Sequence, residues 1–156
     1  MVAVVGIPFD AYSSFMQGAA LAPAQIRKAW KSGAMNLCAE CGIDLGANPN
    51  FIDLGDLDIA GENAIIEKIE TTIDDLLGHG VRIISLGGDH AITYPVFRSY
   101  SSRFAGLDIL HLDAHPDLYD SYDDNRYSHA CGFARIMEEK LASRLVQVGI
   151  RTLNPH

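Results

Sequence analysis

The sequence lacks several features that would assign it to particular classes of protein. It contains no run of about 18 or more apolar residues, the length that a membrane-spanning helix needs. It also contains no internal repeat and no low-complexity tract, which argues against a repeat architecture. Its first residues, MVAVVGIPFDAY, lack the basic segment of a secretory signal peptide and are typical of a buried strand. We therefore expect a cytoplasmic protein.

Positive charge is scarce as well. The chain has 12 Lys and Arg against 20 Asp and Glu, a formal net charge of −8. This balance argues against non-specific binding to nucleic acid or to an anionic membrane surface. It is compatible with a small cationic substrate. The length of 156 residues predicts one domain, or part of one, over residues 1–156.

Cysteine is limited to three residues. Cys38 and Cys41 form a C-x-x-C pair, which in other settings is a redox centre or half of a zinc site. The sequence has neither a second pair nor a thioredoxin-like pattern around this one, so we interpret the two residues as loop thiols. Cys131 lies two residues after His129 and is expected to border a site without acting in it.

Five apolar, β-type runs alternate with helical patterns and long loops. The strands are expected at residues 2–7, 51–54, 82–86, 108–112 and 144–152. The helices are expected at residues 24–30, 62–77, 91–100 and 132–143. The helix over 62–77 is the clearest, because its isoleucines and leucines recur at helical spacing. This alternation predicts the α/β class, with a parallel sheet flanked by helices.

Two of these strands are followed by residue types that commonly bind metals. Residues 82–86 are followed by GGDH, and residues 108–112 by DAHPD. The carboxyl ends of parallel strands meet in one crevice, and residues i, i+2 and i+4 of an extended chain point to one side. Four side chains are therefore expected to converge: His90, Asp113, His115 and Asp117. Two imidazoles with carboxylates suit a divalent ion such as Mn, Zn or Ni.

A carboxylate in such a set can bridge two ions, and two ions about 3.5–4 Å apart activate a water molecule for hydrolysis near neutral pH. The alternative is that each residue is an ordinary polar group at the end of a strand. One D-x-H motif alone would favour that alternative. GGDH and DAHPD together, each after a strand, favour the metal site.

The combined motifs resemble the ureohydrolases, the family of arginases and agmatinases. GGDH, DAHPD and the later YSHACGFARI carry the resemblance, while GIPFDAYSSFMQGAALAPAQIRKA is similar to the family's first strand, loop and helix. LVQVGIRT is similar to the strand after the catalytic loop, so nearly the whole chain is covered. SHA in place of SHG, with FARIMEE after it, is similar to plant-type arginases and bacterial agmatinase-like relatives. The resemblance implies the three-layer arginase-like fold, of which this chain holds the amino-terminal part with the first five strands.

The resemblance also implies a function. The family consists of binuclear-metal hydrolases that cleave a guanidino compound, here of arginine or agmatine type, to urea and an amine. It implies two Mn²⁺ ions per complete site, with Ni²⁺ as an alternative, a small cationic guanidino substrate, and a homo-oligomer. It places the loop at 9–20 near the mouth of the site.

Individual residues take their expected roles from the same resemblance. His129 matches the loop histidine that shuttles a proton, with a structural loop histidine as the alternative. Asn125 and Tyr127 lie where the family's loop faces substrate. Asp89 is expected to orient His90 or a neighbouring backbone group. Asp56 and Asp58, a D-x-D, are expected to be loop polar groups or residues that support the ligands from behind, since the family's second ligand cluster comes later in the chain.

That second cluster is absent from the sequence. Family members are longer and supply another D-x-D from a later strand. Three explanations remain open: a fragment of a complete enzyme, one chain of a split enzyme that needs a carboxy-terminal half, or a degenerate, non-catalytic metal-binding module. Metal-dependent amide deacetylases share the general fold and are a further alternative, although their motifs differ from GGDH and DAHPD.

Overall fold

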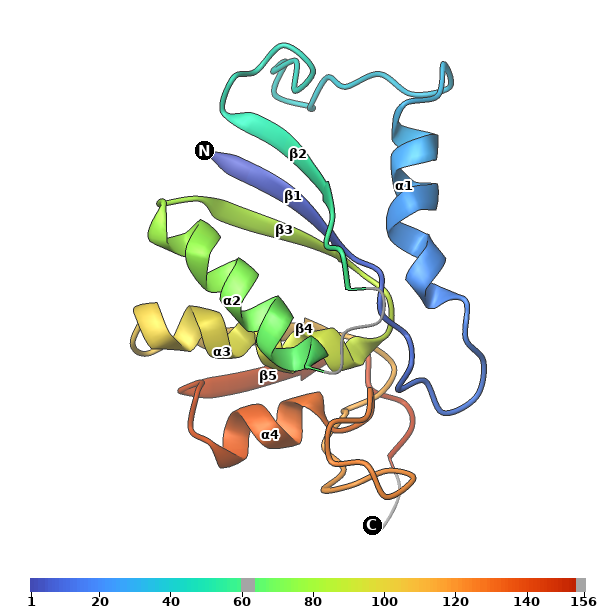
Figure 1. Cartoon of the computed structure of the whole chain (residues 1–156), viewed down its shortest axis with the longest axis vertical. Helices are drawn as coiled ribbons and strands as arrows, with labels where there is room; N and C mark the ends of the chain where they lie inside the picture. The colour runs from blue at the N-terminus through green and yellow to red at the C-terminus, as the bar shows by residue number, and fades with distance from the viewer. Residues whose placement is uncertain (60–63, 154–156) are drawn as a thin grey trace.

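The computed structural model describes residues 1–59 and 64–153 and shows strands alternating with helices (Figure 1). The strands are β1 (Val2–Ile7), β2 (Phe51–Asp56), β3 (Arg82–Gly87), β4 (Asp108–Leu112) and β5 (Arg144–Val148). The helices are α1 (Ala22–Trp30), α2 (Ile65–Gly78), α3 (Thr93–Arg103) and α4 (Gly132–Glu138), with short 3-10 turns η1 (Ala19–Leu21) and η2 (His90–Ile92). The predicted α/β class is confirmed. None of the described helices has the length and apolar character needed to cross a membrane.

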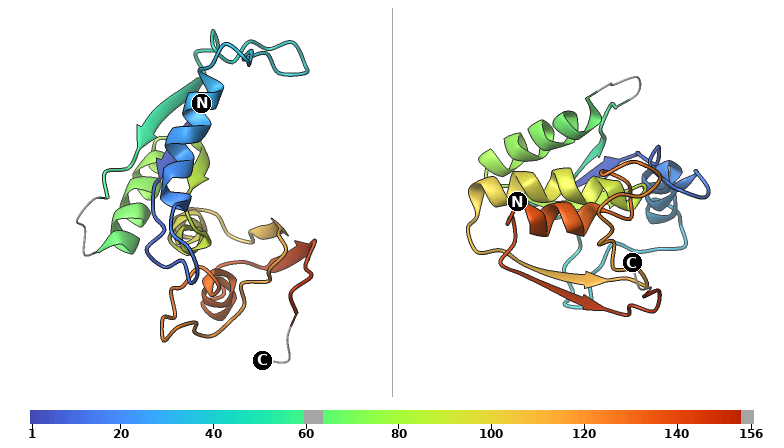
Figure 2. Two further views of the ribbon diagram at one scale, coloured as in Figure 1. Left: turned by 90° about the vertical axis from the view of Figure 1, so that its right-hand side faces the viewer. Right: turned by 90° about the horizontal axis from the view of Figure 1, so that it is seen from below.

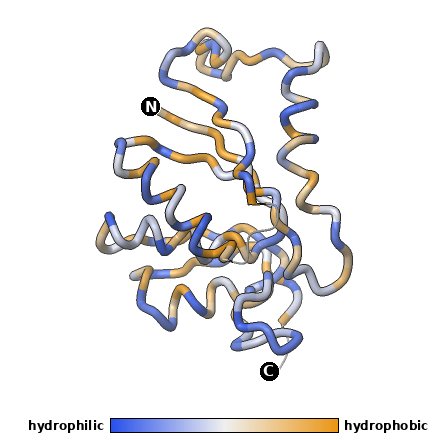
Figure 3. The backbone as a smooth tube through the Cα atoms, in the orientation of Figure 1, coloured by the Kyte–Doolittle hydropathy of each residue, from blue (hydrophilic) through white to orange (hydrophobic). Residues whose placement is uncertain are grey.

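β1 is the centre of a three-stranded parallel sheet with the order β2-β1-β3. Val2 lies opposite Phe51 on one side and opposite Arg82 on the other. Five of the six residues of β1 are buried, because its sequence VAVVGI is apolar toward both faces of the sheet. The hydropathy colours in Figure 3 follow the same division, with hydrophobic strands and a hydrophilic loop between β4 and α4.

Helices cover both faces of this sheet, which gives the three layers (Figure 2). Ile7 packs with Ile69 and Ile73 of α2 in one apolar cluster. The preceding residue, Gly6, points to the opposite face, toward α1. A Cβ there would lie 1.8 Å from a carboxylate oxygen of Asp56, so a larger residue would displace the Asp56 side chain.

Arg27 of α1 closes that face with buried ionic contacts. Its Nε lies 2.9 and 2.8 Å from the two carboxylate oxygens of Asp53, its Nη2 donates to the carbonyl of Gly55, and its Nη1 contacts Asp56. Asp58 is exposed. Asp56 is thus the last residue of β2 rather than a loop residue, and neither it nor Asp58 is in the cluster of candidate metal ligands.

β4 and β5 form a second, separate parallel ladder. The sequence predicted one sheet, but within the described residues β4 pairs with β5 and not with β3. Periodicity identifies a strand without identifying its neighbour, which explains the difference. The inner face of the ladder packs on α3 and α4 through Ile109 and Leu145. Four apolar side chains of the outer face are exposed: Leu110, Leu112, Val146 and Val148.

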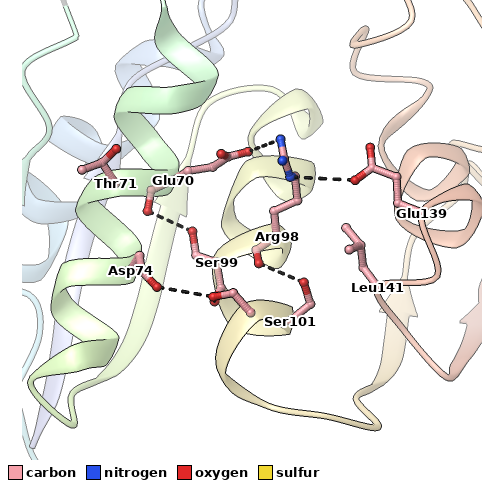
Figure 4. A pocket seen from close by; sticks show the side chains of 9 residues that line it. Glu70, Thr71, Asp74, Arg98, Ser99, Ser101, Glu139 and Leu141 are labelled. Atoms are coloured by element: carbon pink, nitrogen blue, oxygen red, sulfur yellow. Dashed lines mark hydrogen bonds and ion pairs between the residues drawn. The ribbon is translucent and has the colours of Figure 1, made fainter.

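Polar contacts join α2, α3 and the end of α4. Arg98 of α3 lies 3.0 Å from Glu70 of α2 and 3.8 Å from Glu139 after α4 (Figure 4). The hydroxyl of Ser99 donates to the backbone carbonyl of Glu70 at 2.9 Å. Desolvation raises the pKa of Glu70 above its ordinary value, although Arg98 opposes this. The ladder β4–β5 is therefore attached to the first sheet through its helices.

Several element ends differ from the sequence prediction. α4 ends at Glu138 rather than near 143, because Lys140 adopts a positive φ of 56°. β5 ends at Val148 rather than at 152, and Gly149 follows with a φ of 94°. The predicted start of α2 at residues 62–63 lies outside the described residues.

Candidate metal centre

Gly88 determines how closely the end of β3 approaches the segment after β1. A Cβ at Gly88 would lie 2.0 Å from the carbonyl oxygen of Phe9, so glycine allows the end of β3 to pass close to the end of β1. The backbone N–H of Asp89 donates to the same carbonyl at 2.8 Å. His90 is thereby placed beside the ends of β1 and β4.

Asp89 is buried and acts locally. Its carboxylate accepts from the backbone N–H of Ala91 at 3.0 Å, which caps η2, and from the hydroxyl of Ser13 at 3.2 Å. Burial raises the pKa of Asp89, although these hydrogen bonds oppose the rise. These contacts hold the backbone next to His90, and the functional role of Asp89 stays a prediction.

His90 and the DAHPD segment come together. Nδ1 of His90 lies 2.5 Å from Oδ2 of Asp117 and 3.8 Å from Oδ2 of Asp113. Asp117 is buried and has a φ of 50°, a conformation that is uncommon for a residue with a side chain. This backbone turn returns the chain toward His90 and orients the carboxylate inward.

Asp113 lies between two groups of ligand atoms. Its Oδ2 faces His90 and also lies 3.5 Å from Nε2 of His111. Its Oδ1 accepts from the backbone N–H of His115 at 2.8 Å and lies 3.3 Å from Nδ1 of the same residue. The His115 side chain is 63% exposed and lies on the outer side of the carboxylate. Asp113 therefore has an imidazole on each side, an arrangement suited to a bridging carboxylate.

His111 was missed by the sequence prediction. Its donor atom lies within 4.8 Å of donor atoms from His90, Asp113 and Asp117. Position 111 is two residues before Asp113 in a strand, so the alternation used for Asp113, His115 and Asp117 also applied to it. It was overlooked because it lies inside the apolar run ILHL, before the motif.

The charges of the cluster act on one another. Burial alone would lower the pKa of His90, but Asp117, Asp113 and Asp89 raise it above its ordinary value. Burial alone would raise the pKa of Asp113, but the His115 backbone N–H and nearby histidines lower it. Burial and the charge of His90 lower the pKa of His111. These contacts thus favour the ionised form of Asp113.

A pocket of about 360 Å³ contains all four predicted ligands and His129. Nε2 of His129 lies 2.8 Å from the hydroxyl of Ser14, and its ring centroid is 6.3 Å from that of Tyr122. Both partners also line the pocket. Ser14 belongs to the loop at 9–20, which therefore borders the site as the resemblance implies. Sequence reasoning did not single out Ser14.

Asn125 and Tyr127 are placed differently. Neither is among the residues that line this pocket. The side-chain oxygen of Asn125 accepts from the backbone N–H of Tyr127 at 2.8 Å, a local turn contact, and the Tyr127 ring lies 5.6 Å from that of Tyr94. Their contact with substrate stays a prediction.

The cysteines lie outside the ligand cluster. Cys38 and Cys41 are exposed in the loop before β2. Cys131 is buried, its thiol lies 3.7 Å from the backbone carbonyl of Asn125, and burial raises its pKa. A buried thiol with a raised pKa is little ionised near neutral pH, and it is a poor ligand and nucleophile.

The donor set fits a divalent cation. Carboxylates brought this close repel each other unless a positive charge lies between them. The carboxylate oxygens of Asp113 and Asp117 lie close to imidazole nitrogens. This combination of oxygen and nitrogen donors suits Mn, Zn or Ni. Three of the predicted ligands, His90, Asp113 and Asp117, lie in this cluster; His115 lies outside it and contacts only Asp113 of these three, so its role as a ligand stays a prediction.

Known proteins resemble this chain along its whole length. The arginase family model matches residues 1–156. The chain is 42% identical to arginase 1, mitochondrial, of Arabidopsis thaliana, over 97% of this chain and 47% of that protein. The agmatinase of Blochmanniella floridana is 38% identical, over 96% of this chain and 50% of that protein.

Solved structures agree with the sequence matches. An arginase from Medicago truncatula superposes with a TM-score of 0.89 and 38% identity, over 99% of this chain and 51% of that one. An agmatine ureohydrolase of Thermoplasma volcanium gives 0.84 and 33% identity, over 98% and 51%. The fold is that of an α/β protein, and its His/Asp cluster could hold a divalent metal ion. The chain belongs to the arginase family and spans about half the length of the curated relatives it matches.

Proposed function

We propose that this chain forms one part of a binuclear-metal ureohydrolase, which cleaves a guanidino compound of arginine or agmatine type to urea and an amine. The observation that carries the proposal is the position of Asp113, which lies between His90 and His115 in the pocket that also holds His129. Family membership and relatives named as arginases and agmatinases support the reaction class.

Two Mn²⁺ ions, with Ni²⁺ as an alternative, are the proposed cofactors. His90 and Asp117 would serve on one side of Asp113 and His115 on the other, with Asp113 shared between them. When bound, such ions lower the pKa of a coordinated water toward neutral pH. The chain's own contribution is to align these side chains and to hold Asp113 ionised, as the lowered pKa of Asp113 supports.

His129 is proposed as the group that moves a proton to the leaving amine. Its ring lines the pocket, and the Ser14 hydroxyl at 2.8 Å holds its Nε2. A general acid of this kind contributes about 10²- to 10⁴-fold to a rate. Asn125 and Tyr127 are proposed to contact the substrate from the loop after β4, outside the pocket described above.

The chain covers about half the length of its relatives, so the activity of the whole enzyme is a proposal. A second ligand cluster would come from a segment beyond these residues or from a separate chain. A degenerate metal-binding module is the competing proposal, and turnover separates the two. The homo-oligomer stays a prediction. The cytoplasmic location stays a prediction too, since several relatives are named as mitochondrial.

A chimera tests the function directly. Residues 1–156 are joined to the carboxy-terminal half of the Medicago truncatula arginase, whose structure superposes on this chain. We expect urea release from arginine or agmatine after loading with Mn²⁺. A chimera that holds two ions per chain and releases no urea from either substrate contradicts the proposal. Acetate release from acetylated amines in place of urea would assign a deacetylase.

The variant His129→Ala tests the proton-transfer role within that chimera. We expect it to retain Mn²⁺ and to lose about 10²- to 10⁴-fold in kcat. Full activity in this variant removes the role from His129.

A further inference from the structure

His111 lies in the ligand cluster, yet its contacts point to a role other than metal binding. It is 6% exposed, on the inner face of β4, and its ring centroid lies 4.2 Å from that of Phe133. Its Nε2 is one of two buried side-chain nitrogens without a hydrogen-bond partner in the part of the chain that is described. A buried nitrogen of this kind requires either a metal ion or an acceptor, and its tautomer decides which.

Pro116 fixes the orientation of the neighbouring Gln147. One end of the Gln147 amide lies 2.6 Å from the backbone carbonyl of Pro116. A carbonyl only accepts, so the atom facing it is the amide nitrogen. Turning the amide over would place two oxygens 2.6 Å apart. Gln147 is therefore held as a donor by the DAHPD segment itself.

Gln147 in turn fixes the tautomer of His111. The two residues are direct neighbours across the β4–β5 ladder. The same amide nitrogen lies 2.9 Å from Nδ1 of His111. Because that nitrogen donates, Nδ1 accepts and carries no proton. In the neutral ring the proton is then on Nε2, which has no lone pair left for a metal.

The carboxylate nearest to the protonated Nε2 in the ion pairs of the described residues is that of Asp113. The distance from Nε2 to Oδ2 of Asp113 is 3.5 Å, and no other carboxylate contact of His111 is as short among the ion pairs of the described residues. We propose that this contact closes to a hydrogen bond, so that Gln147, His111 and Asp113 form a hydrogen-bonded chain in which His111 is a positioning residue that orients the carboxylate of Asp113 and is not itself a metal ligand. A hydrogen bond to a ligating carboxylate typically contributes about 10- to 100-fold to metal affinity.

The hydrogen-bonded series Gln147–His111–Asp113 connects β5 to the candidate site. β5 supplies no predicted ligand, yet Gln147 reaches both the DAHPD backbone and the ring beside Asp113. The importance of Asp113 as a ligand rests on the proposed function. The tautomer of His111 is independent of the proposed function, because the tautomer is a property of the metal-free chain.

The tautomer is measured first, by long-range ¹H–¹⁵N correlation of the imidazole rings in the metal-free chain. We expect His111 to carry its proton on Nε2, and to keep it there after addition of Zn²⁺, a diamagnetic probe. Gln147→Met removes the donor and should yield a mixture of both tautomers. Val146→Ala, a change at the neighbouring exposed residue of β5, is the matched control and should leave the tautomer unchanged.

Metal affinity is measured second, by titration with Mn²⁺ and detection of the free ion by electron paramagnetic resonance. His111→Gln keeps an N–H donor and should bind within about three-fold of the unaltered chain, whereas His111→Leu and Gln147→Met should weaken binding about 10- to 100-fold. If His111→Leu does not fold, Gln147→Met carries the comparison, because it leaves the ring in place.

Two results would overturn the proposal. One is a His111 ring with its proton on Nδ1 whose Nε2 resonance shifts on binding Zn²⁺, which would make it a ligand. The other is a Gln147→Met variant with unchanged tautomer and unchanged affinity. Failure of the unaltered chain to bind either ion, with the Nε2 tautomer present, would count against the proposed function while leaving the orientation of His111 intact.

Discussion

The two parallel ladders of the molecule differ in how completely they are covered. The β2-β1-β3 sheet has a helix on each face, and Ala3 and Ile7 of β1 are fully buried. The β4–β5 ladder is covered on one face, while Leu110 and Leu112 on the other are 67% and 70% exposed. The covered sheet supplies one predicted ligand, His90, and the half-covered ladder leads into the other three. The most completely buried strand and most of the candidate ligands therefore lie in different parts of the chain.

The comparison shows why the ligands still converge. Each ladder is parallel and ends at the same side of the molecule, so the segments after β3 and β4 meet there. α3 and α4 hold the two ladders together through Tyr94, Phe133 and Ile136. The exposed face lies opposite to this packing. Changes in the first sheet should therefore alter the free energy of unfolding, and changes on the exposed face should not.

The largest expected effect is at the centre of the covered region. Ile73 of α2 is fully buried, and Ile73→Ala should cost about 2–5 kcal/mol in the free energy of unfolding through lost contacts and a cavity. Leu112→Ala is the matched change on the exposed face and should stay within about 0.5 kcal/mol. Urea denaturation measures both. Equal losses would remove the distinction between the two regions.

A smaller loss is expected where α1 covers the sheet. Arg27→Met keeps the aliphatic part of the side chain but leaves Asp53 and Asp56 without their cation. Their side chains are 22% and 34% exposed, so we expect about 2–4 kcal/mol, below the full range for a buried pair. Thermal unfolding should show the decrease. An unchanged midpoint would mean that solvent replaces the guanidinium at no cost.

The same ion pair predicts the pH dependence of stability. Burial raises the pKa of Asp53, but the Gly55 N–H and Arg27 lower it overall to below 3.8. A lowered pKa in the folded state contributes stability above the unfolded value of about 3.8 that is lost as the pH falls through the folded pKa. Asp53→Asn should therefore destabilise the chain at pH 6 and flatten the acid limb below pH 4. If the stability of this variant falls below pH 4 as steeply as that of the unaltered chain, Asp53 is not the source of the pH dependence.

The smallest effect on stability is expected at Ser14. Its contact with His129 is exposed, so Ser14→Ala should change the free energy of unfolding by less than about 0.5 kcal/mol and leave metal content unchanged. In the chimera it should lower kcat several-fold, because the His129 ring loses the partner that holds it. Ser14→Thr keeps the hydroxyl and is the control. Equal kcat for Ser14→Ala and Ser14→Thr would show that the contact is incidental.

Local patterns in the sequence predicted the strands and the ligand cluster well. β1 through β4 and the meeting of His90 with Asp113 and Asp117 follow from apolar runs and from the two-residue period. The separation into two ladders was not predictable, because pairing depends on long-range packing. His111 was predictable from the same period and was overlooked. The end of α4 was missed because the positive φ at Lys140 has no glycine to signal it.

Asp113, which lies between the imidazoles of His90 and His115, is the centre of the proposed metal site. The most direct test is the number of Mn²⁺ ions retained per chain after loading and desalting, for the unaltered protein and for Asp113→Ala, with Leu112→Ala as the folded control. The account predicts retained Mn²⁺ in the unaltered chain and in Leu112→Ala, and none in Asp113→Ala. Equal retention in all three proteins would place the metal elsewhere and contradict the site.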